Sequence, residues 1–201
     1  MYNIFPTAYL PSIHYMSLFL KTESPSIELF ESYKKQSCRT RTNVMTANGI
    51  QTLTVPIVKV NGNHTLTKDI EIAYKEPWQH IQMRCLESAY RKSAYFDYYF
   101  PYFENIYKQK FKTLIELNDY SLKVILKLMK VTKDYSYTND FDKINDNDDY
   151  RISLSKTDGN EIEIPKYYQV FADRHGFIPN LSIVDLLFNE GPSSSIIINN
   201  I

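Results

Sequence analysis

The sequence predicts an α/β protein in which a short-stranded mixed sheet in the N-terminal half is followed by a helical half. Asn48-Gly49 joins two β-rich segments and is a strong hairpin signal. From Pro77 onward the apolar period changes from two residues to 3.6, which is typical of helices. The 201 residues are 43% hydrophobic, with 17 Tyr and 11 Phe, which is enough for one packed core.

We expect a single domain over residues 1–192. Within it, residues 132–149 predict a flexible acidic loop, because aspartates alternate there with Asn, Ser and Thr. This stretch lacks the glycine and glutamate that a calcium-binding loop needs at fixed positions. Residues 193–201 follow Gly191-Pro192 and are expected to form a loosely ordered tail.

The first elements are a strand over Tyr2–Ala8 and a helix over Ile13–Lys21 that Ser12 caps. A strand leading directly into a helix N-terminus often holds an anion, because free N–H groups and the helix dipole point at it. Tyr9 and Ser12 are therefore candidate substrate-binding residues. His14 is a candidate catalytic acid or base, although a histidine in the first helical turn more often packs or contacts solvent.

A second strand over Ile27–Tyr33 leads into the hairpin region Lys35–Val58. Arg39 and Arg41 are two residues apart and would face the same side of a strand. Two guanidinium groups aimed at one surface suit a phosphate or carboxylate. The alternative is that both arginines lie on a solvated face. A further short strand is expected over Thr67–Ala73.

Pro77 suits the start of a helix whose apolar face is predicted to be buried. That face comprises Trp78, Ile81, Cys85, Leu86, Ala89 and Tyr90. Cys85 is accordingly interpreted as a core residue rather than a nucleophile. Pro101 either begins a new helix or kinks the preceding one, and we expect helices over Tyr102–Lys112 and Leu114–Lys130.

Two elements are predicted near the C-terminus. Tyr150–Leu154 and Glu161–Ile164 flank Asp158-Gly159, which has the form of a hairpin. Leu181–Phe188 has the pattern of a final amphipathic helix.

Composition and motifs exclude several function classes. The 23 basic and 23 acidic residues balance, so we expect no nucleic-acid partner. Cys38 and Cys85 lack a CxxC spacing, which favours reduced thiols and a cytoplasmic location over a disulfide or zinc site. No signal peptide or membrane span is predicted. The sequence contains no glycine-rich phosphate loop, HExxH or GxSxG, and it indicates neither a metal site nor a particular cofactor.

Several collinear fragments resemble the WbqC-like family. They are Tyr9-x-Pro11, Ser37-x-Arg39-x-Arg41, Leu53-Thr54-Val55-Pro56, Trp78 with Tyr90, Ala94-Tyr95-Phe96, Asn118, and Leu181-Ser182-Ile183-x-Asp185-Leu186-Leu187. The family is bacterial, is often encoded with O-antigen or other surface-polysaccharide genes, and has no established reaction. The resemblance implies a role near glycan biosynthesis.

The resemblance also implies which residues matter. It marks Tyr9, Pro11, Arg39, Arg41, Thr54, Trp78, Tyr90, Asp185 and Asn189. Two positions depart from the family pattern. Gln82 stands where the family usually has a histidine, with His80 two residues earlier, and Cys38 stands where an aromatic residue is usual.

The leading hypothesis is a group-transfer enzyme that acts on a small phosphorylated or carboxylate substrate, such as a nucleotide sugar or an acyl donor. Arg39 and Arg41 would hold the anion, with Tyr9, Ser12, Thr54, Trp78 and Tyr90 completing the substrate site. His14 or His80 would act as acid or base. The alternative is a non-catalytic module that binds a glycan or a partner enzyme through its abundant aromatic side chains.

Overall fold

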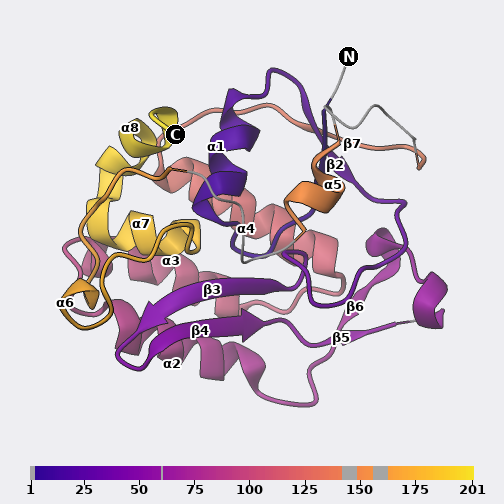
Figure 1. The fold of residues 1–201 in the computed structure, drawn as a ribbon. Coiled ribbons are helices and arrows are strands. Elements are labelled where there is room, and N and C mark those ends of the chain that lie inside the picture. Colours follow the sequence, from indigo (N-terminus) through magenta and orange to yellow (C-terminus); the bar gives the residue numbers. More distant parts are fainter. Residues whose placement is uncertain (1–2, 60, 142–148, 156–162) are drawn as a thin grey trace.

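A parallel sheet of three short strands contains the first strand of the chain (Figure 1). In this computed structural model, which describes residues 3–59, 61–141, 149–155 and 163–201, the strands are β1 (Asn3–Pro6), β2 (Pro25–Glu28) and β7 (Ser136–Tyr137). Their order is β1-β2-β7. The helix α1 (Ile13–Lys21) connects β1 to β2, as parallel neighbours require a crossover.

The helix α1 has the bounds that the sequence predicts. The Ser12 hydroxyl accepts a hydrogen bond from the Tyr15 N–H at 3.2 Å, which caps the helix. Its buried face packs on the sheet, where the rings of Phe19 and Phe5 meet edge to face with centroids 5.3 Å apart.

The predicted hairpin is present as β3 (Arg41–Thr46) and β4 (Gly49–Thr54), which pair antiparallel. Thr46 pairs with Gly49, so the turn residues are Ala47 and Asn48. Of this turn, Gly49 alone has a positive φ, at 100°. The hairpin that Asn48-Gly49 predicts is thus confirmed with the turn one residue earlier, and glycine takes the position that needs a positive φ.

A second antiparallel pair consists of β5 (Ile57–Val58) and β6 (Glu71–Ile72). Two single 3₁₀ turns lie between them, η1 (Gly62–His64) and η2 (Thr67–Asp69). The strand expected over Thr67–Ala73 is thus shorter than predicted, since its first three residues form η2.

Three helices follow, namely α2 (Trp78–Tyr90), α3 (Phe96–Lys108) and α4 (Leu114–Leu128). A capping box of Thr113 and Glu116 starts α4 at the predicted residue. Pro101 lies inside α3 and does not begin it, so the helix expected from Tyr102 starts earlier. The reason is the aromatic run before the proline, whose Phe96 and Tyr99 belong to the buried face of α3.

The region after α4 departs most from the sequence-based expectation. The strand β7 falls within residues 132–149, which were expected to form a loop, while residues 142–148 lie outside the described residues. A short helix, α5 (Tyr150–Ser153), replaces the strand expected there, because the Asp149 carboxylate accepts from the Arg151 N–H and caps it. The predicted hairpin at Asp158-Gly159 also lies outside the described residues.

The C-terminal segment contains α6 (Ala172–His175), α7 (Ile183–Glu190), the 3₁₀ turn η4 (Gly191–Ser193) and α8 (Ser194–Asn199). The Ser182 hydroxyl caps α7. The expected loose tail after residue 192 is instead largely helical, and Ile198 of α8 is fully buried in the core. The apolar Ile196-Ile197-Ile198 run gives α8 a side that can pack on the rest of the chain.

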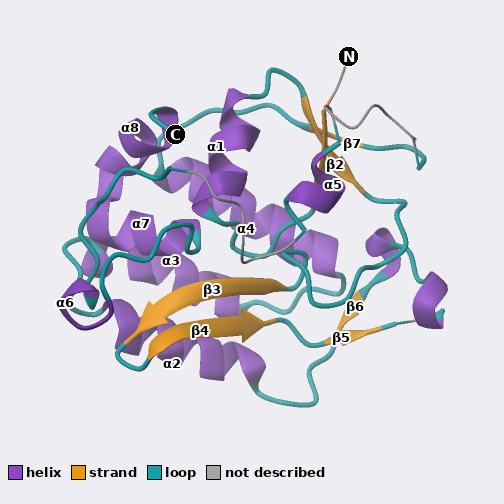
Figure 2. Ribbon diagram, viewed as in Figure 1, coloured by secondary structure: helices purple, strands orange, loops and turns teal. Residues whose placement is uncertain are grey.

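The expected class, short strands in the N-terminal half and helices after them, is confirmed. The described strands form three separate small sheets, one parallel and two antiparallel (Figure 2). Their buried side chains and those of the helices join in one apolar cluster that extends from Phe5 to Ile198. None of the described helices combines the length and the apolar character that crossing a bilayer requires.

Candidate functional site

Arg39, a predicted anion-binding residue, lies in the protein interior. Its Nη2 is 2.5 Å from Oε1 of Glu31, and its Nε donates to the same oxygen at 2.6 Å. Nη1 donates to the Ser155 hydroxyl and Nη2 to the Arg151 carbonyl, at 3.2 and 3.3 Å. Arg39 lies in the turn before β3, whereas Arg41 is the half-buried first residue of that strand. The two residues therefore do not form one anion clamp on a strand face.

A second buried ion pair lies at the carboxyl end of β2. The Arg151 guanidinium contacts Glu28 at 2.6 Å and Asp149 at 2.6 Å, and the Thr138 hydroxyl donates to Glu28 at 2.9 Å. Ligands of α/β proteins often bind at this edge of a parallel sheet. Here the edge is filled by charged side chains that satisfy one another.

The N-terminus of α1 is also occupied by the protein itself. The N–H of Ile13 donates to the Leu181 carbonyl at 3.0 Å, and that of His14 to Oδ1 of Asn180 at 3.0 Å. The next N–H is held by the Ser12 hydroxyl, as described above. The donors of the first turn are thus not open to an anion. Partial burial lowers the pKa of His14.

Tyr9 is fully buried, and its hydroxyl contacts side chains of α2 and α3. Its hydroxyl donates to Oε1 of Gln82 at 2.6 Å and lies 2.7 Å from the Tyr107 hydroxyl. The Gln82 amide in turn donates to the Thr54 carbonyl at 2.8 Å. Gln82, which stands where the related family usually has a histidine, therefore joins the loop after β1 to the end of β4.

Tyr90 and Asp185 belong to a buried polar cluster between α2 and α7. The Asp185 carboxylate accepts from the Tyr167 hydroxyl at 2.7 Å and from the Gln169 amide at 3.2 Å. The Tyr90 hydroxyl lies beside this carboxylate and accepts from the Met45 N–H at 3.3 Å. Burial raises the pKa of Asp185 to about 6, although the hydrogen bonds oppose the shift. Both residues thus lie in the interior.

Two neighbouring hollows along α2 together form a cleft. Both are lined by Ser88 and by residues of the hairpin tip. The first, which we call the neutral hollow, has a volume of about 520 Å³ and lies between β4 and α2. Its lining includes Thr52, Thr54, Trp78, Ile81, Gln82 and Cys85.

Thr54 and Trp78 are the two predicted site residues that this hollow brings together. Trp78 is only 5% exposed, and within the described part of the chain its Nε1–H has no hydrogen-bond partner. Ile81 was expected in the core but is 59% exposed, because Gln82 takes the buried position of that helical turn. His80 is exposed on α2 and lines neither hollow.

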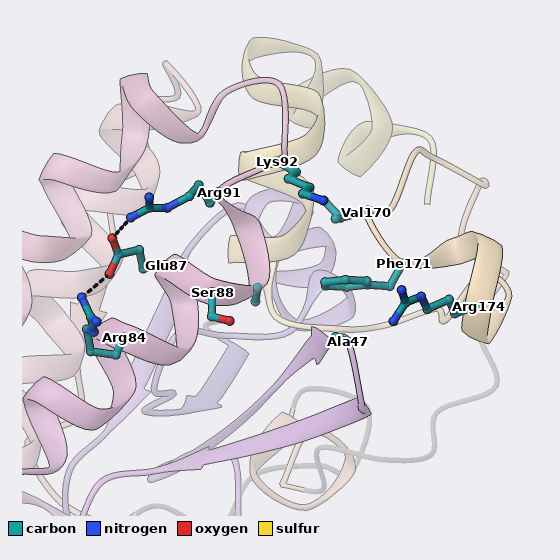
Figure 3. A pocket seen from close by; sticks show the side chains of 10 residues that line it. Ala47, Arg84, Glu87, Ser88, Arg91, Lys92, Val170, Phe171 and Arg174 are labelled. Atoms are coloured by element: carbon teal, nitrogen blue, oxygen red, sulfur yellow. Dashed lines mark hydrogen bonds and ion pairs between the residues drawn. The ribbon is translucent and has the colours of Figure 1, made fainter.

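The second hollow, which we call the basic hollow, has a volume of about 540 Å³. Its lining includes Arg84, Arg91 and Lys92 from α2 and the residues just after it, with Phe171 and Arg174 from the segment around α6 (Figure 3). Phe171 projects into the space between α2 and α6 (Figure 3).

The lining of the basic hollow contains four cations and one carboxylate. Glu87 pairs with Arg84 at 3.1 Å and also with Arg91 (Figure 3). Among the residues that the structure describes, Lys92 and Arg174 have no ion-pair partner. The hollow therefore keeps an excess of positive charge, which suits an anionic ligand.

The sequence contains only part of the signal for the basic hollow. Arg84, Arg91 and Lys92 recur at seven- and eight-residue spacing, which places them on one helix face. Phe171 and Arg174 come from a distant segment, and the sequence does not indicate that they approach α2. This cluster is not among the site residues that the sequence predicts, which centre on Arg39 and Arg41.

Other chemistry in the cleft is limited. Partial burial raises the pKa of the Cys85 thiol, so this side chain is protonated at neutral pH. Within the described ranges, no group of three His, Cys, Asp or Glu side chains is placed to hold a metal ion.

Comparison with protein-family models shows which family the chain is similar to. The model of a family described as the WbqC-like protein family matches residues 7–160, which is the larger part of the chain. Neither a curated protein nor a solved structure matches. The matched range includes β4 and α2 but ends before Phe171 and Arg174.

Proposed function

The chain belongs to the WbqC-like protein family, and from this premise we propose that it is a group-transfer enzyme that binds a phosphorylated substrate in the cleft along α2. The observation that carries the proposal is the basic hollow, which is lined by four cations and a single carboxylate. The substrate class is that of nucleotide sugars or nucleotide-linked acyl donors.

Charge and shape both support a phosphorylated ligand. Guanidinium groups present planar pairs of donors that match phosphate oxygens, and Lys92 adds a compact positive charge. The Phe171 ring in the same hollow offers a surface on which an aromatic base can stack. A volume of about 540 Å³ is within the usual range for small-ligand sites.

The family resemblance supports a place for this reaction in surface-polysaccharide or O-antigen biosynthesis, in the cytoplasm where nucleotide-linked donors are made. Neither His14 nor His80 lines the cleft, so neither is assigned a catalytic role in this proposal. The protein's contribution is to bind and orient the substrate, and to balance the charge that develops on a departing phosphate.

A second candidate is a non-catalytic binding module of the same pathway. The observation that favours it is the composition of the cleft. Among the described residues that line the two hollows there is no histidine, and the one carboxylate, Glu87, is held by two arginines. Such a site binds anions but has little means of moving protons.

Calorimetric titration with nucleoside diphosphates, coenzyme A and pyrophosphate tests the proposal. We expect Lys92→Ala/Arg174→Ala to weaken binding by about a hundredfold or more, because each of the two lost charged hydrogen bonds contributes roughly 1.5–3 kcal/mol. Both side chains are exposed, so the fold should be retained. Lys108→Ala/Lys112→Ala, which removes two exposed cations that line neither hollow, is the charge-matched control and should bind like the wild type.

Two results would count against the proposal. Absence of binding for every phosphorylated probe would exclude the anion site. An equal loss of affinity in the control and in Lys92→Ala/Arg174→Ala would mean that the anion binds outside the basic hollow. Release of the nucleoside diphosphate from a bound nucleotide sugar, with the sugar passing to water or to an added sugar acceptor, separates the two candidates. Binding with turnover identifies the enzyme, whereas tight binding without turnover identifies the module.

A further inference from the structure

We infer that the neutral hollow holds the uncharged, hydroxyl-rich part of the substrate, such as a sugar ring, while the basic hollow holds its phosphates. This inference rests on the function proposed for the basic hollow. It adds a division of the cleft into a charged and an uncharged compartment, and it names the chemical class that each one takes.

The two compartments adjoin each other. Ser88 lines both, and the hairpin tip contributes Ala47 to the basic hollow and Thr46 and Asn48 to the neutral one. A ligand with its phosphates near Lys92 and Arg174 can therefore extend past Ser88 into the neutral hollow without leaving the cleft.

The lining of the neutral hollow suits an uncharged polar group. It contains no lysine, arginine, aspartate or glutamate among the residues that the structure describes there. Its polar groups are hydroxyls and amides, including those of Gln51, Thr52 and Ser88. Such groups both donate and accept hydrogen bonds, as sugar hydroxyls do.

Trp78 provides a second observation that points to a ligand. A buried N–H without a partner is unusual in a folded protein, and it is satisfied when a ligand or water supplies an acceptor. The Nε1–H of Trp78 is in this condition among the described residues, and the side chain lines the hollow. An indole also gives an apolar surface with one donor, which suits the mixed faces of a sugar ring.

The free edge of β4 offers further hydrogen bonds. The Val55 N–H donates to the Thr40 carbonyl at 2.8 Å, whereas the Thr54 carbonyl accepts from Gln82 on the opposite side. Because an antiparallel strand alternates between its two sides, Thr52 also directs its backbone groups away from β3, and its carbonyl accepts from the Gln51 amide at 3.3 Å. Main-chain N–H groups of Thr52 and Thr54 thus border the same hollow.

Paired probes test this division by calorimetry. Each nucleoside diphosphate is compared with its sugar conjugate, UDP with UDP-glucose and with UDP-N-acetylglucosamine, and GDP with GDP-mannose. We expect one conjugate to bind about tenfold or more tightly than its parent, which corresponds to one or two added hydrogen bonds.

Two variants test whether the added affinity of the conjugate arises in the neutral hollow. Trp78→Phe keeps a ring but removes the unpartnered N–H, and it should lower conjugate affinity about five- to tenfold while leaving the parent diphosphate unchanged. Because Phe is smaller than the buried indole that packs on Tyr74 and Tyr107, the melting temperature should fall, and unchanged affinity for the parent diphosphate is the control that the variant is folded. Ile81→Trp places a larger side chain at an exposed position of the hollow and should block the conjugate alone.

The outcomes are distinguishable. If the diphosphates bind through Lys92 and Arg174 but no conjugate gains affinity, or if both variants leave the conjugate unchanged, the inference is overturned and the proposed function stands. If neither diphosphates nor conjugates bind, the proposed function fails and this inference fails with it.

Discussion

The guanidinium of Arg39 and the carboxylate of Glu31 lie 2.5 Å apart in the interior, with 0% and 3% of their side chains exposed. Burial raises the pKa of Glu31 even though Arg39 opposes the shift. The pair joins the turn before β3 to the loop after β2. Because Asn118 donates to the Arg39 carbonyl at 3.0 Å, α4 is tied to the same point.

Arg39→Ala should lower the free energy of unfolding by about 3–5 kcal/mol, because it leaves a buried carboxylate without its partner. Arg41→Ala, at a half-buried position in the adjacent strand, should cost under about 1 kcal/mol. Urea denaturation of both variants measures the difference. Similar small losses would show that Arg39 is not a structural residue and would restore it as a candidate ligand-binding group.

The arginine pair shows where reasoning from the sequence reaches its limit. A spacing of two residues places side chains on one face only if both belong to a strand, and β3 begins at Arg41. The start of a strand depends on its pairing partner, which a single sequence does not reveal. By contrast, α1 was predicted with its bounds because its signals are local, namely the Ser12 cap and the apolar spacing of the following residues.

Long-range contacts explain the other differences. The two-residue strand β7 exists because it pairs with β2, far away in sequence, and its own residues carry no strand signal. The basic hollow likewise depends on α6 approaching α2, which brings Arg174 to the same cleft as Arg84. Trp78 and Thr54 could be named because a family resemblance marked them, and not because their spacing predicts a shared hollow.

The stability of the protein should carry a pH dependence from Asp185. Its pKa is raised from 3.8 to about 6 in the folded protein, so between these values the folded state binds more protons than the unfolded state. The contribution of this group to stability is therefore greatest in acid and falls as the pH rises toward 6. The loss is on the order of 3 kcal/mol, given about 1.4 kcal/mol per pKa unit.

Asp185→Asn removes this titration while keeping an oxygen that can accept from Tyr167 and Gln169. The wild type loses the Asp185 contribution as the pH rises, and the variant does not. We therefore expect the unfolding free energy of the variant minus that of the wild type to increase between pH 4 and pH 7. Denaturant midpoints measured across that range test it, and the comparison cancels the titration of other carboxyl groups such as Glu31. A constant difference across the range would contradict the raised pKa.

Ile198 and Ile196 provide a matched pair within α8. Ile198 is fully buried, whereas Ile196 is 63% exposed. Ile198→Ala should lower the unfolding free energy by about 2–4 kcal/mol through lost packing, and Ile196→Ala by under about 0.5 kcal/mol. Thermal or urea unfolding measures both. Equal and small effects would mean that the segment after residue 192 does not dock on the core.

The two free cysteines should differ in reactivity because only Cys85 lines the cleft. Cys38 is buried and its thiol pKa is raised to about 11, while Cys85 is half-buried with a smaller rise. Since the thiolate is the reactive form, iodoacetamide should modify Cys85 slowly in the native protein at neutral pH. The rate should rise about tenfold with each unit of increasing pH until the pH reaches the thiol pKa. Cys38 should react only after unfolding. Peptide mass spectrometry distinguishes the sites. A nucleotide conjugate that fills the neutral hollow should slow the modification of Cys85. Labelling of Cys38 at the same rate as Cys85 in the native protein would contradict the buried position of Cys38.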